Sequence, residues 1–178
     1  MLGLSLKTVK AGMGVSFVMT GSPCHKAGVR FGDVLLAING DPVQGKSSTD
    51  CLRRLREVDT YEVTLELIDR HLLQTYRIVK EEWTSLGLVF RFGRIDAIKP
   101  GSLAMMAGIP KNSRIIEING DLVVGLADRD LLERFRANGA RLEVRIMPDA
   151  QYRRLVSRIP PSYVRFNMEH ANNKDSVF

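Results

Sequence analysis

The sequence predicts an α+β fold rich in β-structure, made of two copies of one small module. Each copy is expected to be a partly open β-barrel or sandwich flanked by two helices. A block of 18 residues recurs 80 positions later: residues 28–45 read GVRFGDVLLAINGDPVQG and residues 108–125 read GIPKNSRIIEINGDLVVG, with seven identities. In each block a β-rich run ends in Asn-Gly, a strong hairpin-turn signal because both residues tolerate positive φ. A repeat this long indicates one module per copy rather than a solenoid.

The segments that follow each block repeat at the same offset. Helices with apolar positions on one side are expected at 48–56 and 128–136. Each is followed by a segment that alternates between apolar and polar residues, at 62–67 and 141–146. Alternation with a period of two is typical of a half-buried strand, so a strand should close each module.

Upstream of the blocks the two copies differ in length. Leu2-Gly3-Leu4 matches Leu86-Gly87-Leu88 at an offset of 84, so the first copy carries four additional residues. We place them in a loop at 8–14. The second copy has an opening strand at 74–79, whereas no residue precedes Met1 to form its counterpart. Either the sequence is cut there or another segment takes that place.

These observations divide the chain into four parts. The expected boundaries are a first domain lacking its opening strand at 1–70, a short linker at 71–74, a second domain at 75–149, and a tail at 150–178. The tail contains two short helix candidates separated by Pro160-Pro161 and should pack on the tandem, with a disordered end.

Composition excludes several classes of protein. No apolar run approaches the ~20 residues of a membrane-spanning helix, and no signal peptide is visible, which favours a cytoplasmic protein, peripheral at membranes. Neither a GxSxG nor a Walker motif occurs, and Cys24 and Cys51 fit neither a disulfide framework nor a zinc site. We therefore expect a protein that is not an enzyme and that needs no cofactor or metal.

Several repeated motifs resemble the PDZ family, in a series that runs from Leu2 to about Pro148. Any one of them is weak, but the ordered series occurs twice. Within that family the tandem is most similar to the syntenin group, and the C-terminal PDZ pair of the Mint adaptors is the nearest alternative. The motifs are Leu2-Gly3-Leu4 and Leu86-Gly87-Leu88, Gly21-Ser22-Pro23 and Gly101-Ser102-Leu103, Ala27-Gly28-Val29 and Ala107-Gly108-Ile109, and the two Ile-Asn-Gly turns.

The resemblance implies an adaptor or scaffold that binds C-terminal tails of partner proteins, such as membrane receptors or adhesion proteins. The tail would add as a strand to the module's edge, with its carboxylate at the backbone N–H groups of the Leu-Gly-Leu loop. Alternatively, the apolar helix positions belong to the core. The expected first groove comprises Leu2, Gly3, Leu4, Ser5 and Leu6 facing Ser48, Leu52 and Leu55; the second comprises Leu86, Gly87, Leu88, Val89 and Phe90 facing Asp128, Leu132 and Phe135.

Two departures from the family pattern bear on specificity. Family members that prefer Ser or Thr two residues before the terminus usually begin the long helix with His, whereas this sequence has Ser48 and Asp128. We therefore expect permissive grooves. Phe135 is bulkier than the usual Leu or Ile and should make the second pocket shallow or re-angled.

The basic character suggests a second ligand. The chain has a net charge of +6. Syntenin-like domains bind phosphoinositide headgroups, which implies a role for Lys80, Arg91, Arg94 and Arg129 at an anionic phospholipid surface. The alternative is ordinary surface charge. Nucleic acid is not expected, because no array of stacking aromatics is present.

The last three residues, Ser176-Val177-Phe178, have the hydroxyl-x-apolar pattern that a PDZ-like groove accepts. They are a candidate for self-binding, within one chain or in a homodimer. The alternative is a disordered end.

Overall fold

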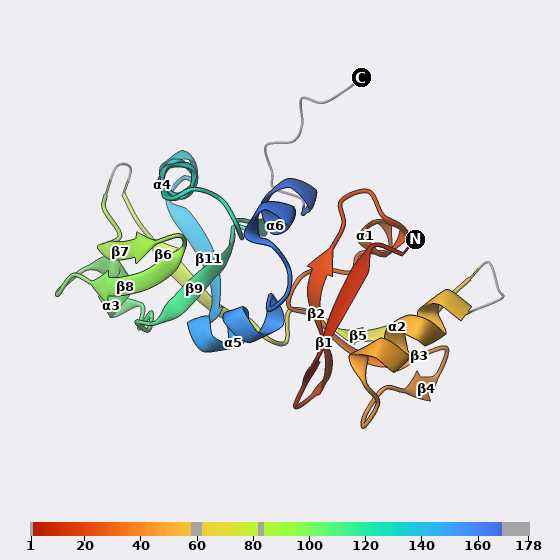
Figure 1. The fold of residues 1–178 in the computed structure, drawn as a ribbon. Coiled ribbons are helices and arrows are strands. Elements are labelled where there is room, and N and C mark those ends of the chain that lie inside the picture. The colour runs from red at the N-terminus through yellow and green to blue at the C-terminus, as the bar shows by residue number, and fades with distance from the viewer. Residues whose placement is uncertain (1, 58–61, 82–83, 169–178) are drawn as a thin grey trace, which may run out of the picture. The chain divides into compact units, whose positions relative to one another are not determined.

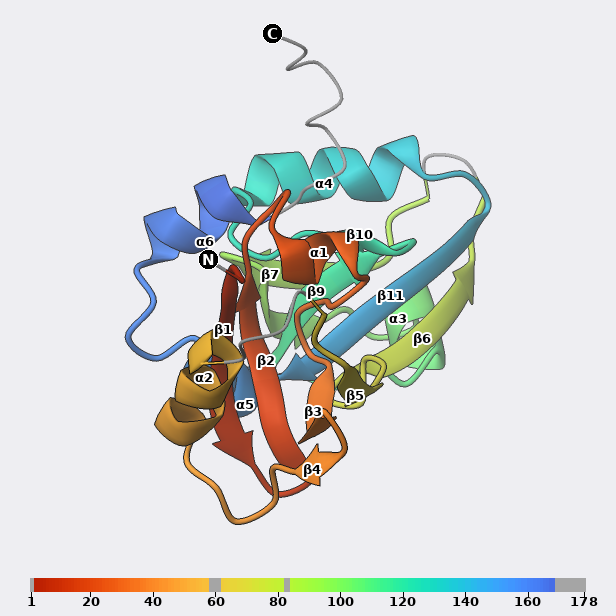
Figure 2. The same ribbon diagram turned by 90° about the vertical axis from the view of Figure 1, so that its right-hand side faces the viewer.

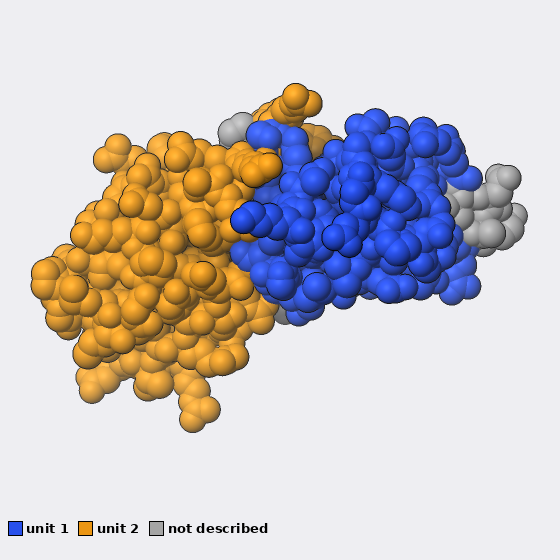
Figure 3. Space-filling view, turned by 90° about the horizontal axis from the view of Figure 1, so that it is seen from below, with its two compact units in different colours: residues 1–72, 155–157 blue, residues 73–154, 158–178 orange. Residues whose placement is uncertain are grey.

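The structure, a computed structural model, describes residues 2–57, 62–81 and 84–168. It divides into two compact units, which Figure 3 colours separately: residues 1–72 with 155–157, and residues 73–154 with 158–178. Each unit contains one copy of the repeat and one antiparallel sheet, which confirms the predicted β-rich α+β fold. None of the described helices is long and apolar enough to span a bilayer.

The first unit has a sheet of five strands in the order β1-β2-β3-β4, with β5 paired to β3 (Figure 1). Helix α2 packs against β1, so these two elements form facing walls. The elements are β1 (Leu4–Val9), β2 (Gly12–Val18), α1 (Pro23–Lys26), β3 (Val34–Ile38), β4 (Asp41–Pro42), α2 (Ser48–Glu57) and β5 (Leu65–Ile68).

The second unit repeats this order and adds a strand in front. Its sheet runs β6-β11-β9-β8-β7, with β10 beside β9, and α4 lies alongside it in Figures 1 and 2. The elements are β6 (Gln74–Val79), β7 (Leu88–Arg91), β8 (Arg94–Ile98), α3 (Leu103–Met106), β9 (Ser113–Ile118), β10 (Asp121–Leu122), α4 (Asp128–Ala137), β11 (Arg141–Pro148), α5 (Asp149–Leu155) and α6 (Pro161–Asn167).

The four additional residues of the first copy lie in strands, which corrects the predicted loop at 8–14. β1 and β2 have six and seven residues, whereas β7 and β8 have four and five. Each strand of the first hairpin is thus two residues longer, and pairing continues to Val9 opposite Gly12. The segment suits a strand because Thr8 and Val9 are β-branched and Met13 is buried in the core.

The closing strands of the two units have different neighbours. β11 pairs with β9 on one side and with β6 on the other. Within the described part of the chain, its counterpart β5 pairs with β3 alone. The opening strand predicted at 74–79 is thus present as β6 and belongs to the second sheet.

Each unit has its own apolar core. The long helices contribute Cys51 and Leu55 to the first core, and Leu131 and Phe135 to the second. These positions are spaced four residues apart, so they form one stripe of each helix that faces the sheet. Because the same helices also form a wall of each expected groove, core packing fixes the position of that wall.

Candidate functional site

The Leu86-Gly87-Leu88 loop presents successive backbone N–H groups away from its module. The carbonyl of Leu86 accepts a hydrogen bond from the N–H of Ala104 at 3.0 Å, and the carbonyl of Gly87 accepts one from Lys99 at 2.8 Å. Because a trans peptide directs its N–H opposite to its C=O, the N–H groups of Gly87 and Leu88 point to the other side. Two successive backbone donors of this kind are chemically suited to an anion.

The first unit has an equivalent loop at Leu2-Gly3-Leu4, which is held in the same way. The carbonyls of Leu2 and Gly3 accept hydrogen bonds from the N–H groups of Cys24 at 3.3 Å and Met19 at 2.7 Å. The N–H groups of Gly3 and Leu4 are therefore directed outward in the same way. The two loops are thus equivalent also in the hydrogen bonds that hold them, whose donors lie outside the Leu-Gly-Leu motif.

Glycine is required at the centre of both loops. Gly3 and Gly87 have φ of +71° and +77°, a region that side chains rarely adopt. A Cβ on Gly87 would lie 2.2 Å from the Cβ of Ser102, and one on Gly3 would lie 2.3 Å from the Cβ of Ser22. Each serine is the N-cap of the short helix behind the loop, so the glycine allows the loop to rest directly on that helix.

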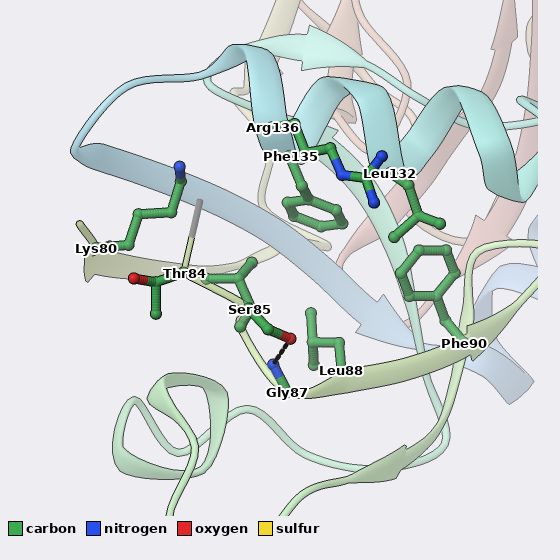
Figure 4. Close-up of a pocket in the computed structure, with 10 residues that line it drawn as sticks. Lys80, Thr84, Ser85, Gly87, Leu88, Phe90, Leu132, Phe135 and Arg136 are labelled. Atoms are coloured by element: carbon green, nitrogen blue, oxygen red, sulfur yellow. Dashed lines mark hydrogen bonds between the residues drawn. The ribbon is translucent and has the colours of Figure 1, made fainter. Parts of the chain in front are cut away.

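A pocket opens next to the second loop, between β7 and α4 (Figure 4). Its apolar wall includes Phe90 and Phe135, whose ring centroids lie 6.1 Å apart at an interplanar angle of 52°. Six of the eight residues predicted for the second groove line it: Leu86, Gly87, Leu88, Phe90, Leu132 and Phe135.

Two cations line the pocket together with the loop. Lys80, at the end of the pocket away from Phe90 in Figure 4, is only 5% exposed, and Arg136 extends from α4. Ser85 Oγ accepts the N–H of Gly87 at 3.3 Å, which partly satisfies one of the loop's donors. The pocket thus combines backbone donors and positive charge beside an apolar wall.

Sequence reasoning missed three residues of this pocket: Thr84, Ser85 and Arg136. Thr84 and Ser85 carried no signal beyond lying just before the Leu-Gly-Leu motif. Arg136 follows Phe135 on the helix, and it was not selected because only the apolar positions of the helix were considered for the groove. Lys80 was selected for a lipid surface, and the structure places it in the pocket.

Two predicted residues of the second groove lie elsewhere. Residues alternate between half-buried and exposed along β7, and Val89 is 46% exposed on the face opposite Leu88 and Phe90. The carboxylate of Asp128 accepts the backbone N–H groups of Phe92 and Gly93 at 2.9 and 3.1 Å. It is therefore bonded to the tip of the β7–β8 hairpin.

The residues predicted for the first groove divide between core and surface. Leu6 and Leu55 are buried in the first core, and Leu2, Leu4 and Leu52 are half-buried against it. Ser5 and Ser48 are half-buried as well. The apolar helix positions Leu52 and Leu55 thus belong to or pack against the core, and their role as a groove wall stays a prediction.

The other cations predicted for lipid have unequal surroundings. Arg94 donates to Asn112 Oδ1 at 2.9 Å and lies 3.5 Å from the carboxylate of Asp96. Arg91 is exposed, and the side chain of Arg129 is 85% exposed. Arg91 and Arg129 are therefore the more accessible of the four.

Comparisons with known proteins agree with this geometry. Residues 1–68 match the model of the PDZ domain. Human syntenin-1 is 31% identical over 169 residues, with 95% of this chain and 57% of syntenin-1 covered. Rat syntenin-2 is 27% identical with the same coverage. The rat amyloid-beta A4 precursor protein-binding family A member 3 is 30% identical over 91% of this chain and 30% of its own length.

Among solved structures, the dmPar3 PDZ1 domain in complex with the dmPar6 PBM is 28% identical, with a TM-score of 0.36. The match covers 42% of this chain and 92% of that one.

The sequence match, the repeated element order and the paired Leu-Gly-Leu loops point to one class: residues 1–68 match the PDZ domain, and the chain as a whole resembles tandem PDZ proteins. Within that class it resembles the syntenins, and it spans 57% of the length of syntenin-1.

Proposed function

We propose that this protein is an adaptor that binds the C-terminal tails of partner proteins, foremost membrane receptors or adhesion proteins, by strand addition. The observation that carries the proposal is the pair of outward-facing N–H groups at Gly87 and Leu88, beside a pocket that is apolar on one wall and cationic at one end. A peptide terminus offers the matching features: a carboxylate, an unpaired strand edge and a last side chain.

In this proposal the terminal carboxylate accepts hydrogen bonds from the N–H groups of Gly87 and Leu88, and the hydrogen bond from Gly87 to Ser85 Oγ is exchanged for one of them. Lys80 and Arg136 supply positive charge near the carboxylate, in a partly desolvated pocket where it acts more strongly than in water. The peptide then pairs antiparallel with β7, whose outer edge has no partner strand among the described residues.

The last side chain of the ligand would enter the space bounded by Leu88, Leu132 and Phe135. Because Phe135 fills part of the pocket and also belongs to the core, it limits the depth available. Replacing Phe135 by alanine should widen the choice of terminal residue toward larger side chains. Unchanged preferences on a peptide array would refute this role for Phe135.

A matched pair of peptides tests the proposal. One ends in a free carboxylate, and the other has the same sequence but ends in a carboxamide. If the loop recognises the carboxylate, NMR titration of the full chain should shift the amide signals of Gly3 and Gly87 with the acid and leave them unchanged with the amide. Equal binding of both peptides, or shifts confined to other surfaces, would refute carboxylate recognition.

We also propose an anionic phospholipid surface as a second ligand. The net charge of +6 and the exposed side chains of Arg91 and Arg129 support it. The hydrogen bond of Arg94 to Asn112 makes this arginine a weaker contributor. Sedimentation with liposomes should show binding that requires phosphoinositide and falls on Arg91→Gln and Arg129→Gln. It should not fall on Arg77→Gln, because Arg77 Nε makes a hydrogen bond to Glu143 at 3.0 Å, a closer contact than the 3.7 Å between Arg129 and Asp130. Equal losses in all three variants would indicate unspecific charge.

Self-binding through Ser176-Val177-Phe178 remains a proposal, because these residues lie outside the described part of the chain. If the tail occupies a groove, removing these three residues should tighten binding of an external peptide. Unchanged affinity would argue against it.

A further inference from the structure

The tip of the β7–β8 hairpin is a two-residue turn whose conformation needs support. Phe92 and Gly93 connect the strands, and both have positive φ, +49° and +73°. Positive φ at both positions suits the right-handed twist of a hairpin but is unfavourable for a bulky residue such as Phe92. Both N–H groups of the turn donate to the carboxylate of Asp128. The turn is therefore held by a charged acceptor that belongs to another element.

The carbonyl side of the same turn is held as well. Arg114, on β9, donates from Nη1 to the carbonyl of Phe92. The same guanidinium donates from Nε and Nη2 to Asp149 Oδ1, at 2.9 and 2.7 Å, and lies 4.4 Å from the centre of the Tyr152 ring. Because the side chain of Asp149 is only 3% exposed, this charge-assisted pair is largely shielded from water.

These bonds join the two walls of the second groove. Asp128 is the first residue of α4, which forms one wall, and the hairpin tip ends β7, which forms the other. β7 has four residues, so the strand edge in front of the tip is about 13 Å long. If a ligand pairs with this edge and its C-terminus lies at the Leu-Gly-Leu loop, its last four residues extend along β7 as far as the hairpin tip.

The first module lacks this junction. Its edge strand β1 has six residues, and Ser48 stands at the position equivalent to Asp128. Among the described residues no hydrogen bond joins Ser48 to the tip of the β1–β2 hairpin. The first groove thus has a longer edge, without a bridge at its end.

We propose that Asp128 is a positioning residue that closes the far end of the second groove, so that this groove selects only the last four residues of a ligand. Arg114 supports the closure from the other side of the turn. The first groove, by contrast, also selects residues further upstream. The inference rests on the proposed function, since it describes how the same groove limits its ligand.

The experiment compares two peptides that share their last four residues. The probes are acetyl-Asp-Ser-Val-Phe and acetyl-Ala-Ala-Ala-Ala-Asp-Ser-Val-Phe, titrated into the full chain, with the amide signals of Gly3 and Gly87 reporting each groove separately. At Gly87 the two dissociation constants should agree within about twofold. At Gly3 the longer peptide should bind at least about threefold more tightly, since its additional residues form main-chain hydrogen bonds with the longer edge of β1.

Asp128→Ala should make the longer peptide bind more tightly than the shorter one at Gly87. It should also speed hydrogen exchange of the Phe92 and Gly93 amides by tenfold or more. Asp130→Ala is the matched control, because it removes a carboxylate from the same helix turn. Asp130 lies 3.7 Å from Arg129. This variant should change neither the affinity ratio of the two peptides nor the hydrogen-exchange rate. Arg114→Lys keeps the charge, loses the forked contact and should speed the same exchange.

The outcomes distinguish the two proposals. A several-fold preference for the longer peptide at Gly87 in the unmodified chain would overturn the inference. So would unchanged hydrogen exchange or an unchanged affinity ratio in Asp128→Ala. Absence of any shift at Gly87 with either peptide would instead refute the proposed function, while the exchange rates alone would still decide whether Asp128 holds the tip.

Discussion

Replacing Gly87 by alanine should weaken carboxylate binding in the second module while the first remains intact. The added methyl group meets two obstacles. The backbone has φ +77°, which costs a non-glycine residue about 1–2 kcal/mol, and the new Cβ would lie 2.2 Å from the Cβ of Ser102. Ordinary contact between carbon atoms is about 3.5–4.0 Å, so the loop or helix α3 must move by more than about 1 Å.

A movement of that size is enough to break a hydrogen bond whose donor and acceptor are about 2.9 Å apart. A hydrogen bond to a charged group contributes a net ~1.5–3 kcal/mol. Losing one of them should therefore weaken peptide binding by about 10- to 150-fold. Fluorescence anisotropy with a labelled C-terminal peptide measures the affinity, and the NMR signal of Gly3 reports whether the first groove still binds.

Gly101→Ala is the matched control for this prediction. Gly101 has φ +70°, but no atom lies within 4 Å of a Cβ built there. The control thus carries the same backbone strain without the collision with Ser102. A dissociation constant for Gly87→Ala within about twofold of the unmodified chain would refute the reasoning, as would an equal loss of affinity in Gly101→Ala.

Three further predictions concern stability and reactivity. Leu131→Ala, at a fully buried position, should lower the free energy of unfolding by about 2–5 kcal/mol in urea, whereas Leu132→Ala on the exposed side should mainly weaken peptide binding. Burial raises the pKa of Asp33 in the folded protein above its value in the unfolded chain. As the pH rises from the unfolded to the folded pKa, the unmodified chain should therefore lose stability relative to Asp33→Asn. A stability difference between the two proteins that does not depend on pH would contradict this. Burial also raises the pKa of Cys24 and Cys51, so iodoacetamide should react with the native thiols far more slowly than with the chain in urea; equal rates would contradict it.

The repeat was readable because it consists of local signals. Asn-Gly turns, helix periodicity and the Leu-Gly-Leu motif each span only a few residues, and their order determined the fold class and most of the second pocket. The four additional residues were assigned to a loop because nothing local distinguishes a long hairpin from a loop between strands. Pairing of Val9 with Gly12, which extends the hairpin, is a contact between strands and appears only in the folded module.

The sequence by itself determined that this protein has two PDZ-like modules with glycine at the centre of each Leu-Gly-Leu loop, because the residue types and spacing required there are local. Tertiary structure decided the chemistry around the second loop. Lys80, which directly follows β6, and Arg136, on α4, line one pocket although they are far apart in the chain. It also decided that the carboxylate of Asp128 turns to the hairpin tip, because its partners, the N–H groups of Phe92 and Gly93, lie more than 30 residues away in sequence and meet it only through the packing of β7 beside α4.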